Sequence, residues 1–172
     1  MCAALAALLL CSLTACGKTE EPARQDIFAM DTYMSLVAYG EDGQEALAAA
    51  AREINRLEQE LSRTVSTSYI YKLNENGSAA VSEETANLLK AAMDYSAATG
   101  GLFDMTVAPL VSLWGITTDS PRVPSRSEID ALLPLVGSDH VHLDGQTVTL
   151  DAGCAVDLGG IAKGYASDRV AQ

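Results

Sequence analysis

Basic side chains are scarce in this chain of 172 residues, which has 11 lysines and arginines against 23 aspartates and glutamates. The formal net charge is therefore −12 at pH 7. Proteins that bind nucleic acid gather lysine and arginine on one face, so this balance argues against a nucleic-acid partner. Internal repeats are missing too, and the length predicts one globular domain or most of one.

Charged side chains are absent before Lys18. The run "MCAALAALLLCSLTAC" is too short to cross a bilayer as a permanent helix, and it is typical of a secretory signal, which we expect over residues 1–15. Its end, "LTAC", resembles the bacterial lipobox, in which the cysteine becomes the lipidated first residue of the mature protein. The alternative is a buried apolar helix with a chance cysteine, although such a helix would show helical periodicity.

The lipobox interpretation predicts lipidation at Cys16, a polar linker over residues 16–28, and a position on the extracytoplasmic face of the cell membrane. A basic residue normally precedes the apolar run of a signal, and its absence here suggests a start further upstream. Cys2 and Cys11 lie in the signal and Cys16 would carry lipid. Only Cys154 then remains, so the mature part of this sequence is not expected to hold an intrachain disulfide.

Apolar periodicity predicts the first elements of the body, which we expect to begin at residue 29. Residues 32–40 are rich in aromatic and branched side chains and end in glycine, which indicates a strand. Residues 64–77 are interpreted as a polar, hydroxyl-rich stretch that ends in a turn. Between them, residues 41–63 predict a helix with one apolar stripe, formed by Leu47, Ala50, Ile54, Leu57 and Leu61.

Capping residues indicate where two further helices begin. Ser82 is a favourable N-cap, and the helix after it is expected to stop at Gly100. Ser125 and Glu128 have the spacing of a capping box, which predicts a third helix directly after Ser125.

Residues 140–150 alternate around an Asp-Gly pair, which is a strong signal for a hairpin. Residues 154–158 predict a final buried strand, and a last helix should start near Gly160. The mixture and order of these elements predict an α+β domain with an antiparallel or mixed sheet and packed helices.

The segment "VDLGGIAKGYASDRV", residues 156–170, places two glycines between a buried run and a helix. Glycines let a ligand approach the backbone, and a helix start attracts anions, so this turn could hold a phosphate. Lys163 could add a positive charge, and Asp157 could accept from a ligand or lie near a metal ion. The alternatives are that Asp157 caps the helix and that Lys163 is simply solvated.

A second segment, "TGGLFDMTVAPLVSLWG", covers residues 99–115 and surrounds Asp104 with apolar side chains. A carboxylate in such a run must be paired, capped or bound to a ligand, because burying it alone is costly. Such a wall suits a flavin or nucleotide, with apolar contacts for a ring and a carboxylate for a ring or ribose donor. The alternative is that Asp104 caps a helix and Trp114 lies in the core.

Taken together, these two segments and two earlier ones resemble the ApbE family of bacterial FAD:protein FMN transferases, which are often periplasmic lipoproteins. The earlier segments are "MDTYMSL" at residues 30–36 and "LSR…SYIYKLN" at residues 61–74. All four occur in the family's order with sensible gaps, and the resemblance runs from about residue 25 to residue 172.

The resemblance implies the α+β fold of the family and an enzyme that binds FAD with Mg²⁺. The enzyme would split the FAD pyrophosphate and attach FMN through a phosphoester to a threonine or serine of a target flavoprotein. Acceptors in the family include subunits of sodium-pumping NADH:quinone reductase and of the related Rnf complexes, as well as extracytoplasmic flavoproteins.

The resemblance also assigns residues to the site. At the position of Thr64, many members carry a tyrosine that stacks on the ligand, so Thr64 stands where an aromatic contact is expected. The backbone carbonyl of Gly160 matches a ligand of Mg²⁺, and a glycine suffices there because no side chain is needed. The positions expected to contact FAD are Met30, Thr64, Leu102, Phe103, Asp104, Asp157 and Lys163.

Family members continue for another half-domain, which carries further Mg²⁺ ligands and a histidine implicated in catalysis. We therefore expect this sequence to be the N-terminal part of such an enzyme, without catalytic residues of its own. His140 and His142 match no catalytic position and are expected in a strand or loop. Two other functions stay open: a flavin-binding lipoprotein without transferase activity, and a pyrophosphatase that hydrolyses FAD to FMN and AMP.

Overall fold

The computed structural model describes residues 21–116 and 118–172, so the predicted signal over residues 1–15 and the predicted lipidation site Cys16 lie outside the described residues. None of the helices in the described part combines the length and the apolar character that crossing a membrane requires. In chain order, the elements are β1 (Ala23–Ala29), β2 (Thr32–Ala38), α2 (Gly43–Leu61), α3 (Tyr69–Asn76), β3 (Ser78–Ala80), α4 (Glu83–Ala98), the 3-10 helix η2 (Met105–Val107), α5 (Ala108–Trp114), α6 (Arg126–Leu132), the 3-10 helices η3 (Leu133–Leu135) and η4 (Ser138–His140), β4 (Val141–Asp144), β5 (Thr147–Leu150) and α7 (Ala162–Val170).

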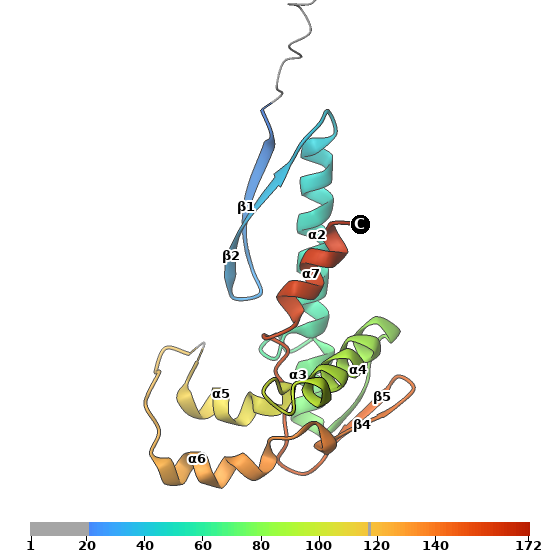
Figure 1. The fold of residues 1–172 in the computed structure, drawn as a ribbon. Helices are drawn as coiled ribbons and strands as arrows, with labels where there is room; N and C mark the ends of the chain where they lie inside the picture. Colours follow the sequence, from blue (N-terminus) through green and yellow to red (C-terminus); the bar gives the residue numbers. More distant parts are fainter. Residues whose placement is uncertain (1–20, 117) are drawn as a thin grey trace, which may run out of the picture.

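The architecture is α+β, as predicted. Strands β1 and β2 form an antiparallel hairpin that lies along α2, and α7 packs against the same helix (Figure 1). A second sheet has the order β3-β5-β4 and is antiparallel throughout. The predicted hairpin over residues 140–150 is the β4–β5 pair of this sheet.

Strand β1 corrects the predicted linker, because it begins at Ala23 and not after residue 28. Its residues alternate between half-buried and exposed, which is the period of a strand with one face on α2. The charged residues Arg24 and Asp26 occupy exposed positions, and with Gln25 they gave this segment the composition of a linker.

Helix α2 buries one apolar stripe, as the spacing predicts, with one difference. Leu47, Ile54, Leu57 and Leu61 are buried, but the alanine that is buried with them is Ala51, while the predicted Ala50 is half-buried. Both alanines fit spacings of three and four, so only the packing against neighbouring elements decides which one turns inward.

Helix α3 lies inside the stretch that was expected to be polar and irregular. Ser68 caps it by accepting from the Tyr71 backbone N–H at 2.9 Å, and Gly77 ends it in the left-handed conformation. Only Ile70 and Leu73 of this short helix are buried, so too few apolar residues mark its periodicity in the sequence.

The predicted N-caps are confirmed. Ser82 accepts from the Thr85 backbone N–H at the start of α4. Ser125 and Glu128 form the reciprocal hydrogen bonds of a capping box at the start of α6.

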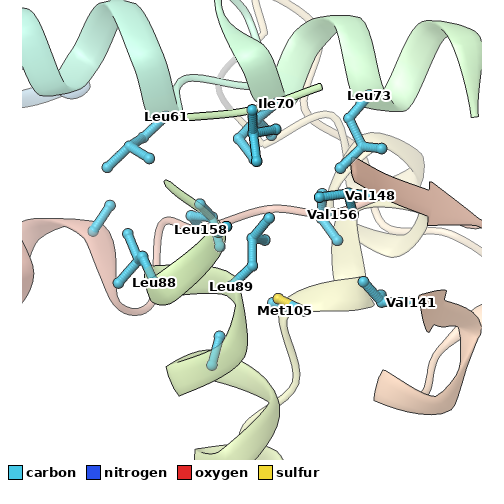
Figure 2. Close-up of a cluster of buried hydrophobic side chains, with 14 of the residues drawn as sticks. Leu61, Ile70, Leu73, Leu88, Leu89, Met105, Val141, Val148, Val156 and Leu158 are labelled. Atoms are coloured by element: carbon cyan, nitrogen blue, oxygen red, sulfur yellow. The ribbon is translucent and has the colours of Figure 1, made fainter. Parts of the chain in front are cut away.

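The core lies where α2, α3, α4, η2 and the second sheet meet. Figure 2 shows side chains from these elements pointing toward one another. Cys154 is a buried free thiol of this core. The largest fully buried side chains are Leu57, Ile70, Leu73, Leu89, Met105, Val148, Val156 and Leu158.

Cys154, Val156 and Leu158 are buried, but residues 154–158 are not a strand of either sheet, which corrects the predicted final strand. The side chain of Asn74 takes the place of a neighbouring strand. Its amide donates to the Val156 carbonyl at 2.9 Å, and its oxygen accepts from the Val156 N–H at 2.8 Å. Met105 adds a third bond, since its carbonyl accepts from the Asp157 N–H at 2.7 Å.

We predict that Asn74→Ala lowers the free energy of unfolding by about 3 kcal/mol, because it leaves a buried N–H and a buried C=O without partners. Urea denaturation measures this change. Asn76→Ala, at the exposed last position of the same helix, is the matched control and should change the free energy by less than about 0.5 kcal/mol. Equal effects of the two variants would contradict the role assigned to Asn74.

A second prediction concerns Glu128. Hydrogen bonds from the Arg122 guanidinium, and then from Ser125, lower the pKa of its carboxyl from the ordinary 4.5 to about 2. A carboxyl with a depressed pKa contributes stability above its unfolded pKa, and this contribution is lost as the pH falls toward 2. A ¹³C NMR titration of the Glu128 carboxyl should therefore show a midpoint near 2 in the folded protein.

Two variants test whether Arg122, and not the nearby Arg126, causes this shift of the Glu128 pKa. Arg122→Ala should move the Glu128 midpoint upward, because it removes the largest cause of the shift. Arg126→Ala should leave it unchanged, because Arg126 pairs with Asp130. A wild-type midpoint near the ordinary value would contradict the prediction.

Candidate functional site

All residues that the resemblance assigns to FAD and to Mg²⁺ line one hollow of about 580 Å³. They come from four separate segments: the β1–β2 turn, the residues that follow α2, the loop between α4 and η2, and the turn before α7 together with the first turn of that helix. The structure thus brings together Met30, Thr64, Leu102, Phe103, Asp104, Asp157, Gly160 and Lys163.

The β1–β2 turn carries Met30 and Asp31 to this hollow. Both residues have positive φ angles, 52° and 55°, which side chains other than glycine rarely adopt. The Met30 N–H donates to Oε1 of Glu58 at 2.9 Å, and this hydrogen bond ties the turn to α2. Strain held in place by a specific contact is a feature of binding sites.

The loop after α4 carries Leu102, Phe103 and Asp104. Gly100 and Gly101 have positive φ angles, and they reverse the chain directly after the helix. The Phe103 N–H then donates to Oγ1 of Thr99 at 3.1 Å. Leu102 is 93% exposed at the rim, which leaves a large apolar side chain available to a ligand ring.

Gly160 lies close to the ring of Phe103. A Cβ at residue 160 would lie 3.1 Å from Cε2 of the Phe103 ring, closer than side chains normally approach. The two residues also line a second hollow of about 510 Å³ between α4 and α7. A side chain at residue 160 would therefore press on the Phe103 ring, which lies between the two hollows.

Asp104 is satisfied by hydrogen bonds, so the interpretation of this residue as a helix cap is confirmed. Its Oδ1 accepts from the N–H of Thr106 at 2.8 Å and from the hydroxyl of Thr106 at 2.6 Å. Its Oδ2 accepts from Ser96 at 3.2 Å and from Ser138 at 3.4 Å. The carboxylate is thus held in one orientation at the edge of the hollow. Trp114, expected in the core under the same interpretation, is 37% exposed.

Asp157 is paired on both oxygens. Its Oδ1 accepts from the Gly159 N–H at 2.7 Å, and its Oδ2 lies 2.8 Å from Nε of Arg63. The residue therefore closes the glycine turn, and it does not cap α7, whose N-cap residue is Ile161.

Helix α7 begins at Ala162, close to the predicted start, and carries Lys163 on its first turn. The Lys163 side chain is exposed at the hollow, and among residues 21–116 and 118–172 it has no ion-pair partner. Its ammonium could therefore meet a phosphate, while the alternative of simple solvation stays open.

Glu84, on α4, connects α7 to α4 and to α2. Its Oε1 accepts from the Tyr165 hydroxyl at 2.6 Å and lies 3.2 Å from Nε of Arg169. Its Oε2 lies 2.8 Å from Nη2 of Arg56 on α2. Burial, and then the bond to Glu84, raise the pKa of Tyr165 to about 12, so its hydroxyl keeps the proton that this bond needs.

Arg63 and Asp31 are the charged residues of this hollow that sequence reasoning missed, and Arg63 pairs with Asp157 of the same hollow. Arg63 stands inside one of the four segments that carry the resemblance, but no role came with the resemblance. Its partner Asp157 is distant in the sequence, so no local pattern reveals the pair.

His140 and His142 do not line this hollow. His142 lies in strand β4, as expected, but His140 is the last residue of the 3-10 helix η4 and not part of a strand or loop. Both contact Asp151: Nδ1 of His140 lies 3.0 Å from Oδ2, and Nε2 of His142 lies 2.8 Å from Oδ1. The bond to Asp151 raises the pKa of His140.

Within the described ranges, no group of three or more His, Cys, Asp or Glu side chains is arranged to hold a metal ion. The expected Mg²⁺ fits this hollow only in part. The Gly160 carbonyl is a hard oxygen ligand of the kind Mg²⁺ prefers, but the Asp157 carboxylate beside it is already paired. The remaining ligands would have to be phosphate oxygens, water or residues from elsewhere.

Comparison with known proteins connects this geometry to a family. A model of the ApbE family matches residues 30–172. The FAD:protein FMN transferase of Vibrio cholerae is 33% identical over 178 residues, which cover 98% of this chain and 53% of that protein. The enzyme of the same name from Salmonella typhimurium is 30% identical over 188 residues, which cover 100% of this chain and 54% of that protein. The chain spans about half the length of the curated relatives it matches.

Solved structures agree. The ApbE protein from Thermotoga maritima has a TM-score of 0.82 and 35% identity, with 87% of this chain and 51% of that chain covered. The flavin transferase ApbE from Vibrio cholerae has a TM-score of 0.76 and 28% identity, with 88% of this chain and 52% of that chain covered. The fold, the four segments around one hollow and these matches lead to one conclusion: the chain belongs to the ApbE family.

Proposed function

We propose that the protein transfers FMN from FAD to a threonine or serine hydroxyl of a target flavoprotein. One observation carries this proposal: the seven residues expected to contact FAD, which come from four separate segments, line a single hollow. The hollow offers an apolar wall at Leu102 and Phe103 and a cation at Lys163, which suits a ring joined to phosphates. The names of the relatives support the same activity.

In the proposed reaction, the acceptor hydroxyl attacks the phosphorus on the FMN side of the FAD pyrophosphate. A new P–O bond forms, the bond to the bridging oxygen breaks, and AMP leaves with that oxygen. The hydroxyl proton passes to a base, and none of the hollow's residues is assigned that role here. Phosphoryl transfer depends mainly on positioning and charge neutralisation, which this chain can supply.

Individual groups of the chain serve those two needs. The start of α7 and the Lys163 ammonium would neutralise phosphate charge. The carboxylate of Asp104 already accepts four hydrogen bonds, so it would orient a ring or ribose donor by exchanging its longest one, the 3.4 Å bond from Ser138. Thr64 lies at the hollow in place of an aromatic residue, so the apolar contact with the ring would fall on Leu102 and Phe103.

Mg²⁺ is part of the proposal. The Gly160 carbonyl would be its ligand from this chain, and the ion, when bound, would neutralise charge on the pyrophosphate oxygens.

We also propose that the protein works at the extracytoplasmic face of the cell membrane, held by lipid on Cys16. The "LTAC" sequence and the apolar run before it support this location. Acceptors of the Rnf or sodium-pumping NADH:quinone reductase type fit the family resemblance.

The activity predicts a covalent product. The protein isolated from its natural source is incubated with FAD, Mg²⁺ and an acceptor protein that carries the target threonine. We expect a yellow-fluorescent acceptor band on a denaturing gel and a mass gain equal to one esterified FMN. The acceptor with that threonine replaced by alanine is the control, and a reaction without Mg²⁺ tests the metal.

The possible failures of this experiment are distinct. FAD binding without a covalent product would contradict transfer and indicate a flavin-binding protein. AMP release that needs no acceptor would indicate hydrolysis of FAD. Absence of FAD binding would contradict the proposed function altogether.

The contact between Gly160 and Phe103 gives a prediction about affinity. Gly160→Ala should raise the dissociation constant of FAD by about tenfold or more, because the new methyl group displaces the Phe103 ring. Gly164→Ala, close by on α7, has no atom within 4 Å of the added carbon and should leave the affinity unchanged. Titration of flavin fluorescence measures both constants, and equal affinities of the two variants would contradict the assigned role of the ring.

A further inference from the structure

Arg63 reaches two walls of the FAD hollow at once. It follows the end of α2, and its side chain is 18% exposed. Its Nε lies 2.8 Å from Oδ2 of Asp157, at the turn before α7. Its terminal nitrogens reach α5 and the residues directly after it: Nη1 donates to Ser112 Oγ on α5, and Nη2 donates to the carbonyl of Ile116, two residues past the end of α5, both at 3.4 Å.

Asp157 connects Arg63 to the glycine turn at residues 159–160. One of its oxygens is held by Arg63, and the other accepts from the Gly159 N–H. A carboxylate fixed on one oxygen has its second oxygen fixed as well, because the group is planar. The orientation of the Gly159 peptide therefore depends on the Arg63 guanidinium, and Gly160, whose carbonyl is the proposed Mg²⁺ ligand, comes next in the chain.

We propose that Arg63 is a positioning residue of the FAD site, which acts through Asp157 to hold the turn at residues 159–160 at a fixed distance from α5. This inference rests on the proposed function in one respect, namely that FAD is the ligand of the hollow. The hydrogen bonds that carry it belong to the chain itself.

An arginine suits this task better than a lysine would. The guanidinium is planar, and its nitrogens donate in several fixed directions, so one side chain can pair with Asp157 and reach α5. An ammonium could pair with Asp157 but could not span both walls. The effect of Arg63→Lys should therefore lie between those of the wild type and Arg63→Ala.

The first test needs no ligand. In Arg63→Ala, the released Asp157 carboxylate should protect the Gly159 amide less, and hydrogen exchange at this amide should speed up by about tenfold. Amides of Leu89 and Val148, which are fully buried in the core, should keep their wild-type exchange rates and show that the variant is folded. Arg126→Ala removes the same charge from an exposed ion pair on α6 and should leave the Gly159 amide unchanged.

The second test is a double-mutant cycle on FAD affinity, measured by fluorescence titration of the protein. Arg63→Ala should raise the dissociation constant by about tenfold, as is usual when support for a ligand-binding group is removed. Asp157→Ala should raise it at least as much. Because Arg63 acts through Asp157, the double variant should bind FAD no more weakly than Asp157→Ala alone.

Each result decides one point. Unchanged exchange at Gly159, or unchanged FAD affinity in Arg63→Ala, would overturn the proposal. A double variant whose dissociation constant rises by the product of the two single increases would also overturn it, because Arg63 would then contact FAD directly. A wild-type protein that does not bind FAD would refute the proposed function, and the exchange measurement would still show whether Arg63 holds the turn.

Discussion

The structure depends on how residues 154–158 are held in the core. Val156 and Leu158 are fully buried, yet none of the strands in residues 21–116 and 118–172 pairs with their backbone. Buried N–H and C=O groups need partners, and the Asn74 side chain supplies both for Val156. These two hydrogen bonds fix the position of residues 154–158 relative to α3, and with it the position of the turn before α7.

Residues 154–158 alternate between buried and half-buried positions, and this alternation links their packing in the core to the candidate site. Val156 and Leu158 point into the core, so the residue between them must point to the other side, where the hollow lies. That residue is Asp157, and its two oxygens connect Arg63 to the Gly159 peptide. Packing in the core and the geometry of the candidate site are therefore parts of one arrangement.

The sequence predicted those features whose cause is local. Helix α2, the Ser82 cap, the capping box at Ser125 and the β4–β5 hairpin each depend on residues within a few positions of one another. Residues 154–158 could not be predicted in detail, because their partner Asn74 acts across the domain. Strand β1 and helix α3 were not predicted either, because each has few buried apolar residues and is held in place by elements distant in the sequence.

The site was predicted differently. Single motifs left alternatives open, and the resemblance selected the residues that prove to share one hollow. It gave no role to Arg63, because the bond to Asp157 exists only in the folded chain.

The charges of the hollow show what such a site would still need for a pyrophosphate. Three carboxylates line it, those of Asp31, Asp104 and Asp157, against the two cations Arg63 and Lys163. Arg63 is already paired with Asp157, and Asp104 is satisfied by neutral hydroxyl and amide donors that add no positive charge. Neutralisation of phosphate would therefore fall on Lys163 and on the start of α7, with the Asp31 charge opposing it. A second source of positive charge beside Gly160 is what this balance calls for, and a divalent cation would supply it.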